Sequence, residues 1–376
     1  MSVRRRAPLP IALSSAFLSL ALIASPATAA GPTVSVVASG LDNPRGIDVG
    51  ADGRVFVAAA GHGGDAGGFG TSGRIVVIDH GSVRTYVGGL PSAISDEGEV
   101  TGPVNVALDA RGNAVAVIGG GPQAVDPRFN TVRRLSPPLG RILGDVQAYQ
   151  NTDPDPTDID PVPNPYDSNP YGIAVLDGAR TLVTDAGNND LLLVGPTGRI
   201  VTVARFPNQM ISTAFLPPFF GIPNDIELPA EAVPTSVAVG PDGYWYVGEL
   251  KGFPFTPGTS RIWRIAPSAR GVTCDPAATS GPCTLYMDGF TSITGLDFGP
   301  DGSLYVVEMV KSGVLNAFIG GDVIGALWKV KGGTKTELVP GRLTLPGDVA
   351  ITRGGRIYVT NLSISVGGGE VLAITP

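Results

Sequence analysis

The stretch NPRGIDVGADGRVFVAA, Asn43–Ala59, decides the fold, because close variants of it recur along the chain. Each copy has two apolar runs separated by a turn, typically Asp-Gly or Gly-Gly. Such a turn between apolar runs predicts a β-hairpin, since glycine adopts positive φ without a steric penalty. The further copies are GPVNVALDARGNAVAVIG (Gly102–Gly119), NPYGIAVLDGARTLVTD (Asn169–Asp185), VPTSVAVGPDGYWYVGE (Val233–Glu249), SITGLDFGPDGSLYVVE (Ser292–Glu308) and LPGDVAITRGGRIYVTN (Leu345–Asn361). The chain therefore contains six repeats.

Further strands follow each hairpin. A third apolar segment follows in every repeat, as in GRIVVID (residues 73–79) and DLLLVG (residues 190–195), and a fourth closes most repeats. Four antiparallel strands, repeated six times at intervals of about 50 to 65 residues, predict an all-β fold, the six-bladed β-propeller. The segment Thr33–Leu41 reads as a fourth strand ahead of the first repeat, and the sixth repeat has only three strands. We therefore expect this N-terminal strand to complete the last blade and close the ring.

The propeller prediction sorts the loops onto two faces. First strands line the channel of a propeller, so the loops that enter them share one face with the loops joining second and third strands. We call this the top face; the Asp-Gly turns lie on the other. We expect residues 31–376 to form a single propeller domain with top-face insertions at about 136–169 and 207–232. The first insertion contains GRILGDVQAYQ (residues 140–150), whose apolar spacing is near-helical.

The N-terminus and the cysteines predict export. Residues 1–30 combine a basic Arg4-Arg5-Arg6, an apolar run and an Ala27-Thr28-Ala29 cleavage pattern, which is typical of a Sec-type signal peptide. We therefore expect a secreted protein, extracellular or periplasmic, with no membrane span in the mature form. Cys274 and Cys283 are the two cysteines, and in an exported protein they predict a disulfide.

The charge of the chain limits its partners. The full sequence has 26 basic and 33 acidic residues, a net charge of −7. Removing residues 1–30 removes three arginines and no acids, which leaves 26 − 3 = 23 basic residues and a net charge of 23 − 33 = −10. An acidic surface argues against nucleic acid or an anionic membrane as a partner. We expect a monomer that binds a small hydrophobic ligand or an extracellular protein.

Three segments carry a family resemblance. NPYGIAVLDGARTLVTDAGNNDLLLV, VPTSVAVGPDGYWYVGELKGFPFTPGTSRIWRI and FTSITGLDFGPDGSLYVVE resemble the ScyD/ScyE family of secreted bacterial proteins. That family is named for its association with scytonemin biosynthesis clusters, and it is similar to NHL-type and TolB-like six-bladed propellers. The resemblance covers essentially the whole mature chain and implies a propeller fold. It brings no established catalytic motif.

One column of the repeats suggests a metal site. The residues that close the second strands include four oxygen donors, which we expect at the top rim near the axis: Asp185, Glu249, Glu308 and Asn361. Oxygen donors from several blades are what Ca²⁺ requires, and related lactonases and phosphotriesterases hold such an ion in the channel. The alternative interpretation is structural: these side chains accept backbone N–H bonds from their own loops between strands two and three.

Other top-face residues are candidates for ligand binding. Asn105, Ser236 and Asp348 align at the entry to the first strands and would complete a metal shell. The loops also carry aromatic side chains, among them Phe219, Phe220, Phe253 and Phe255. Apolar loops on one face indicate mutual packing, a ligand cleft or a partner surface.

A glycine-rich loop, Gly61–Gly73, presents His62 on the same face. Its GHGGDA segment matches G-x-G-x-x-A, the dinucleotide-binding pattern, but a run so rich in glycine cannot form the helix that this fold requires. We interpret it as a flexible loop between two antiparallel strands.

Two hypotheses of function follow. The first is an exported, non-catalytic binding or scaffold propeller that uses its top face. The alternative is a Ca²⁺-dependent lactonase-like or esterase-like hydrolase that uses the acidic ring at the channel mouth. The first is favoured, because no catalytic residue can be named: no G-x-S-x-G elbow occurs and the chain has only two histidines.

Overall fold

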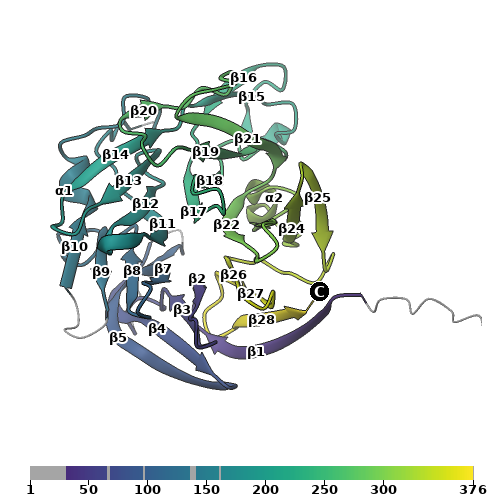
Figure 1. The fold of residues 1–376 in the computed structure, drawn as a ribbon. Coiled ribbons are helices and arrows are strands. Elements are labelled where there is room, and N and C mark those ends of the chain that lie inside the picture. Colours follow the sequence, from purple (N-terminus) through teal and green to yellow (C-terminus); the bar gives the residue numbers. More distant parts are fainter. Residues whose placement is uncertain (1–30, 66–67, 96–97, 136–140, 161, 376) are drawn as a thin grey trace, which may run out of the picture. The chain divides into compact units, whose positions relative to one another are not determined.

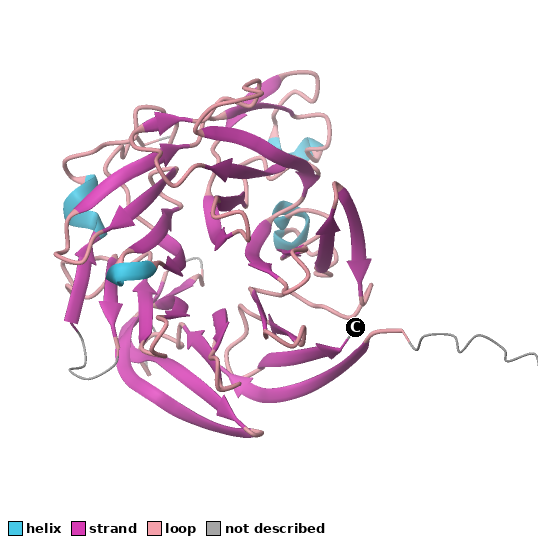
Figure 2. Cartoon of the chain, in the orientation of Figure 1, coloured by secondary structure: helices cyan, strands magenta, loops and turns pink. Residues whose placement is uncertain are grey.

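Each of the six repeats forms the two inner strands of one β-sheet. In the computed structural model, which describes residues 31–65, 68–95, 98–135, 141–160 and 162–375, six sheets surround a central axis (Figure 1). They belong to one compact unit, Pro32–Pro376, and nearly all of their elements are strands (Figure 2). The predicted six-bladed β-propeller is confirmed. The predicted signal peptide, residues 1–30, lies outside the described residues.

Each blade contains four or five strands, which follow one another from the axis outward. Blade 1 contains β2 (Pro44–Val49), β3 (Val55–Ala59), β4 (Phe69–Asp79), β5 (Ser82–Ile94) and β6 (Val100–Thr101), and blade 2 contains β7 (Pro103–Leu108), β8 (Ala114–Ile118), β9 (Thr131–Arg134) and β10 (Arg141–Asp145). Blade 3 contains β11 (Pro170–Val175), β12 (Thr181–Asp185), β13 (Asp190–Val194), β14 (Ile200–Arg205) and β20 (Val272–Thr273). Blade 4 contains β17 (Pro234–Val239), β18 (Trp245–Glu249), β19 (Ser260–Ile265) and β21 (Cys283–Phe290). Blade 5 contains β22 (Ile293–Phe298), β23 (Leu304–Glu308), β24 (Ala326–Lys331) and β25 (Thr334–Leu338), and blade 6 contains β26 (Val349–Ile351), β27 (Ile357–Asn361), β28 (Gly369–Thr375) and β1 (Thr33–Leu41).

The N-terminal strand closes the ring. β1 pairs antiparallel with β28, with Thr33 opposite Thr375 and Leu41 opposite Gly369 (Figure 1). Leu41 is buried in a cluster that blade 6 shares with blade 1. This closure removes the exposed third-strand edge that blade 6 would otherwise have, as the sequence predicts.

The first top-face insertion differs from the prediction. The helix expected across residues 140–150 is wrong in its first half, because Arg141–Asp145 forms β10, the outer strand of blade 2. Only Val146–Gln150 is helical (α1), and Asp145 caps its N-terminus by accepting a bond from the Ala148 N–H. Pairing with the edge of β9 offers backbone partners that five residues of isolated helix lack, so tertiary context overrides the local pattern.

The second insertion forms a small sheet of its own. Within residues 207–232, β15 (Gln209–Ser212) pairs with β16 (Glu227–Ala230). A short helix, α2 (Val314–Phe318), lies in the loop between the second and third strands of blade 5. Among the described residues, no helix has the length and apolar character that a membrane span requires.

Close packing at the axis depends on alternating glycines. At the third position of the aligned repeats, counted from Pro44 and its equivalents, glycine and a polar residue alternate around the ring: Gly46, Asn105, Gly172, Ser236, Gly295 and Asp348. A Cβ on Gly46 would lie 2.6 Å from the Cα of Asn105, and one on Gly295 would lie 2.7 Å from the Cα of Asp348. Real side chains do not approach backbone this closely, so each glycine makes room for the polar residue of the next blade.

The hydrophobic core lies between the blades. Six buried clusters fill the six interfaces, for example Leu182, Leu191 and Val203 of blade 3 against Val247 and Trp263 of blade 4. Every residue of the second strands is buried. Because both faces of these strands contact a neighbouring blade, their sequences are mostly apolar rather than alternating with solvent-exposed residues.

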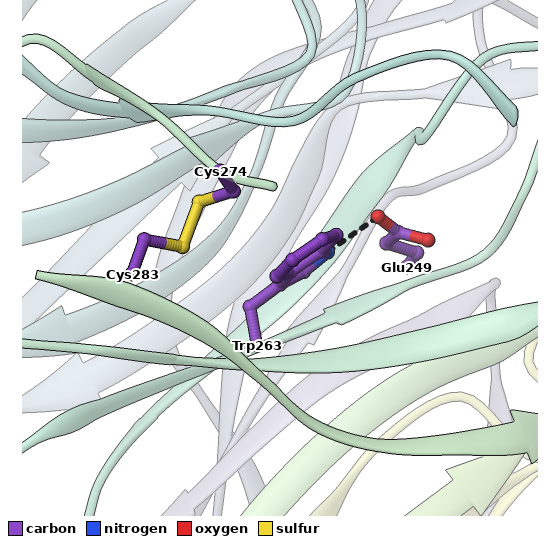
Figure 3. Close-up of a disulfide and its surroundings, with 4 residues drawn as sticks. All are labelled: Glu249, Trp263, Cys274 and Cys283. Carbon is purple, nitrogen blue, oxygen red and sulfur yellow. Dashed lines mark hydrogen bonds between the residues drawn. A yellow bond between two sulfur atoms is a disulfide. The ribbon is translucent and has the colours of Figure 1, made fainter. Parts of the chain in front are cut away.

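The predicted disulfide is present and fastens a loop across two blades. Cys274 and Cys283 are bonded, both are buried, and they lie beside Trp263 (Figure 3). The loop of blade 4 that contains Cys274 extends to the outer edge of blade 3, where β20 runs parallel to β14. The bond holds this crossing loop against β21.

Removing both cysteines should lower stability modestly. The disulfide closes a short loop with a sequence separation of 9 residues, so chain entropy predicts a loss of roughly 2–3 kcal/mol in the Cys274→Ser/Cys283→Ser variant. Denaturant unfolding of the variant and the oxidised parent measures the difference. Equal unfolding midpoints would contradict a stabilising role for the bond.

Candidate functional site

Three carboxylic acids lie in the central channel. Asp48 and Asp297 occupy the fifth position of their first strands, and Asp348 lies immediately before β26. They line a cavity of about 240 Å³ whose walls come from the first strands of all six blades. No lysine, arginine or histidine is among the described residues that line this cavity.

These acids connect neighbouring blades. Asp48 accepts a bond of 2.7 Å from the Leu108 N–H of blade 2, and Asp297 accepts one of 2.7 Å from the Ile351 N–H of blade 6. Asp348 accepts a longer bond, 3.3 Å, from the Ile47 N–H of blade 1. Each also accepts the N–H of the residue that follows it. The acids therefore hold blades 5, 6, 1 and 2 together at the axis.

Burial raises the pKa of all three carboxyls toward or into the neutral range. It raises the pKa of Asp48 to about 6, against the opposing backbone hydrogen bonds. It raises the pKa of Asp297 to about 7, to which the nearby charge of Asp48 adds. The pKa of Asp348 is raised well above its usual range, chiefly by burial. A protonated carboxyl avoids the cost of an unpaired charge in this narrow space.

Stability should therefore fall as the pH rises. A carboxyl with a raised pKa binds its proton more tightly in the folded chain than in the unfolded chain, where Asp titrates near pH 4. Its stabilising contribution is complete below the unfolded pKa and is lost as the pH rises through the folded pKa, here about 6 to 7 for Asp48 and Asp297. We expect the free energy of unfolding, measured with denaturant, to be lower at pH 8 than at pH 5 by a few kcal/mol. This corresponds to a pKa difference on the order of one to two units between the folded and unfolded chains.

Asp297→Asn should reduce this pH dependence, because its side chain does not ionise. It should also lower stability at pH 5, because the amide NH₂ cannot replace the lost acceptor. Asp288→Asn on the exposed surface of β21 is the control and should keep the parental profile. An unchanged pH profile in Asp297→Asn would contradict the assignment.

Three of the four residues predicted to bind metal contact the loops that enter their own blades. Asp185 accepts bonds from the Asn169 N–H at 2.6 Å and the Ser168 hydroxyl at 2.9 Å. Glu308 accepts the Thr291 N–H at 2.8 Å, and Asn361 accepts the Thr344 N–H at 2.8 Å. The hydrogen-bond donors lie mainly in the loops that enter the first strands. The structural interpretation had placed them in the loops between the second and third strands. Of these three residues, Asp185 also accepts a bond from that second kind of loop, from the Gly187 N–H.

The fourth residue, Glu249, forms a buried ion pair. Its carboxylate accepts a bond of 2.6 Å from the Lys251 ammonium. It also accepts one of 2.5 Å from the Trp263 indole N–H, which Figure 3 shows. Glu249 and Lys251 are 0% and 1% exposed. Burial lowers the pKa of Lys251, and the charge of Glu249 opposes that shift. Both oxygens of Glu249 are thus occupied by partners in blade 4.

The structure does not bring the four predicted ligands together. In the part of the chain that the structure describes, no three His, Cys, Asp or Glu side chains are placed to hold a metal ion. Each predicted ligand has polar partners of its own, described above. A calcium site built from Asp185, Glu249, Glu308 and Asn361 remains a prediction that this geometry does not support.

The ion pair gives a stability prediction. Lys251→Met should cost roughly 3–5 kcal/mol, because it leaves the Glu249 carboxylate buried without a counter-ion. The double variant Glu249→Gln/Lys251→Met should be more stable than Lys251→Met alone, because it removes the stranded charge. Lys311→Met, which breaks a partly exposed pair with Glu337, is the control and should cost about 1 kcal/mol or less. Denaturant unfolding measures all three, and a Lys251→Met variant as mildly affected as the control would contradict the prediction.

A larger cavity opens at the top mouth of the channel. It measures about 440 Å³, and residues that enter or leave the inner strands of all six blades contribute to it. Most of its side chains are apolar: Leu250, Phe255, Met309, Val314, Phe318 and Ile364. The polar side chains in its wall include Arg45, Tyr171 and Thr294 at the second position of their first strands. We call this space the top cavity.

The predicted aromatic residues do meet one another. Phe219 stacks on Phe220 at 4.8 Å between ring centroids, Phe220 lies 6.2 Å from Phe253, and Phe253 contacts Phe255 edge to face at 6.3 Å. Phe255 lines the top cavity. The aromatic row therefore runs from the exposed Phe219 in the second insertion to the wall of the cavity, which combines mutual packing with a contribution to a cleft.

The other predicted ligand residues lie elsewhere. Asn105, Ser236 and Asp348 line the narrow channel cavity rather than the top cavity. His62 lies in the loop after β3, where its backbone N–H bonds to the Ser72 hydroxyl, and it is not among the residues that line the top cavity.

The glycine-rich loop near His62 is held by hydrogen bonds. The Ser72 hydroxyl donates to the Gly63 carbonyl, and the Gly63 N–H donates to the Ser92 hydroxyl. A Cβ on Gly70 would lie 2.4 Å from the Gly63 carbonyl oxygen. Glycine is needed here for close approach of two chain segments, not for a phosphate.

Arg45, Asp48 and Asp297 were not predicted from the sequence as site residues. Each interrupts a first strand that is otherwise apolar or small, in PRGIDV and ITGLDF. A charged residue within a strand that lines a channel is the signal that would have identified them, because such side chains face the axis.

Comparisons with known proteins agree on the fold. No protein-family model matches the chain, and no curated protein matches its sequence significantly. Among solved structures, a putative oxidoreductase (glucose dehydrogenase) from Thermus thermophilus is similar with a TM-score of 0.54 and 18% identity, over 92% of this chain and 100% of that one. A PQQ-bound aldose sugar dehydrogenase from Streptomyces coelicolor has a TM-score of 0.52 and 13% identity, over 91% and 98% of the two chains.

A streptogramin B lyase is also similar, with a TM-score of 0.49 and 13% identity over 92% of this chain and 97% of that one. At these identities the likeness concerns the fold alone. The six sheets around one axis make the chain a six-bladed β-propeller, and the two dehydrogenase structures have a similar fold.

Proposed function

We propose that the protein is an exported, non-catalytic binding propeller, of the ScyD/ScyE type that its sequence resembles, and that it binds a small, mainly apolar molecule in the top cavity. The observation that carries the proposal is the cavity itself. Its volume of about 440 Å³ lies within the range of small-molecule sites, and apolar side chains form most of its wall.

The apolar character of this face supports binding. Phe318 and Ile364 line the cavity and are 74% and 41% exposed, so both present apolar surface to water. The row Phe219–Phe220–Phe253–Phe255 extends that surface beyond the cavity. Exposed apolar groups around a concave site lose contact with water when a ligand binds, which favours association.

The scaffold supports a preformed site. The residues of the cavity follow or precede inner strands whose side chains are buried between blades. A site on such elements requires little rearrangement when a ligand binds, which limits the entropic cost of binding.

The hydrolase alternative has less support. It needs a metal ion or a paired nucleophile and base near the substrate. Both oxygens of Asp185 and of Glu249 accept bonds from neighbouring groups, Glu308 accepts the Thr291 N–H with one oxygen, and none of the three residues lines the top cavity. The binding role is therefore the function that the geometry supports best.

A neutral fluorescent probe tests the proposal. N-phenyl-1-naphthylamine, which is uncharged and apolar, should bind saturably with an increase in emission. Ile364→Trp should weaken binding by about tenfold, because the larger ring fills the cavity rim. Ile364 is partly exposed, so the substitution should not disturb the core.

Val366→Trp is the matched control. Val366 lies in the same loop and is 56% exposed, but it does not line the cavity. Its variant should bind the probe within about twofold of the parent. Failure of the parent to bind the probe, or equal binding by Ile364→Trp and the parent, would contradict the proposed function.

A further inference from the structure

We propose that the ligand of the top cavity carries a carboxylate, which pairs with the guanidinium of Arg45 while the rest of the ligand contacts the apolar wall. The inference rests on the proposed function and adds the chemical class of the ligand: a small amphipathic monoanion.

Arg45 is a buried cation without a counter-ion in the described part of the chain. Arg45 is 9% exposed and lines the top cavity. Its Nη2 donates to the Val100 carbonyl at 3.1 Å, and its Nε has no acceptor. No described carboxylate lies within 4.0 Å of its guanidinium, in contrast to Lys251, which contacts Glu249 at 2.6 Å.

Such a charge is costly unless an anion approaches it. Burying an unpaired ion costs several kcal/mol, and a single peptide carbonyl offsets only part of that cost. A guanidinium presents parallel N–H donors that match the two oxygens of a carboxylate. A carboxylate ligand would therefore gain a charge-assisted pair and would relieve a cost already present in the free protein.

A second unsatisfied group lies in the same wall. Thr294 is 3% exposed, its hydroxyl has no hydrogen-bond partner among the described residues, and it lines the top cavity. Thr235, also in the wall, donates instead to the Ile293 carbonyl at 2.6 Å. A buried hydroxyl without a partner is unusual, and a polar ligand atom would supply one. Thr294 thus adds a second unpartnered donor to the wall of the cavity that Arg45 lines.

The surroundings determine which anion is suitable. Glu99 also lines the cavity, but it is exposed, so water and salt screen its charge. The chain carries a net charge of −7, which gives no general attraction for anions. Selection must therefore come from the local pair with Arg45 and from the apolar wall. This combination favours a carboxylate on an apolar body over an inorganic anion or a polyphosphate.

Matched probes test the charge requirement. 2-Naphthoate and 2-naphthamide have nearly the same shape, but only the first is an anion at pH 7.5. Calorimetric titration of the full chain should show that 2-naphthoate binds at least about tenfold more tightly. Arg45→Gln should remove this preference and keep the affinity for 2-naphthamide within about threefold, and Arg45→Lys should retain part of the preference.

The control is Arg111→Gln, in an exposed turn between β7 and β8 on the other face, which should leave both affinities unchanged. Thermal shifts of the parent protein provide a measurement that needs no variant: 2-naphthoate should raise the melting temperature more than 2-naphthamide. Thr294→Val should lower the affinity for 2-naphthoate more than that for 2-naphthamide.

The outcomes separate the two proposals. Equal affinities for both probes in the parent, with binding weakened by Ile364→Trp, would overturn the role of Arg45 and leave the binding function intact. A preference for 2-naphthoate that survives in Arg45→Gln would likewise overturn the assignment of Arg45. Absence of binding by both naphthyl probes and by N-phenyl-1-naphthylamine would overturn both proposals.

Discussion

The convergence of six first strands on one axis is the constraint on which the rest of the structure depends. Six strands cannot all carry side chains at the same level of so narrow a channel. The chain meets this limit by alternation: Gly46 faces Asn105, and Gly295 faces Asp348, with a Cβ–Cα separation under 3 Å if either glycine carried a Cβ. Packing at the axis therefore determines which repeats have glycine and which have a polar residue at this position. It also sets the spacing of the surrounding blades.

Buried charged groups are compensated in different ways in the channel, between the blades and at the top mouth. Burial raises the pKa of Asp297 to about 7, so its carboxyl holds its proton to a much higher pH than an exposed Asp, and it still accepts a backbone N–H bond from blade 6. Glu249, between the blades, is matched by Lys251. Arg45 at the top mouth reaches no described carboxylate and donates to the Val100 carbonyl. This cation without a described counter-ion lines the cavity that a ligand can enter, so we connect Arg45 with ligand binding.

The repeat pattern predicted the blades and their closure because both depend on local signals, the Asp-Gly turns and the apolar runs. It could not predict β10, since Arg141–Asp145 is a strand only through its pairing with β9. The candidate site was harder. The sequence placed Glu249 on the correct strand, but the partner that occupies it, Lys251, is two residues further on and turns inward through a positive φ of 80°. Which donor occupies which oxygen depends on three-dimensional packing that no repeat alignment contains.

The two faces of the propeller differ in a way that bears on function. On the face opposite the top cavity, tight turns such as Gly50–Gly53 connect first and second strands, and acids there serve their own turns: Asp52 accepts the Arg54 N–H. The top face instead carries both insertions, the helix α2 and the aromatic row. A cavity of about 580 Å³ also lies on the turn face, where turn residues such as Gly50–Arg54 and Asp109–Gly112 line it. The long loops of the top face add a mostly apolar wall from several blades to one space. The apolar wall is why we place the proposed binding on the top face, where the loops can vary while the strands beneath them remain fixed by packing at the axis.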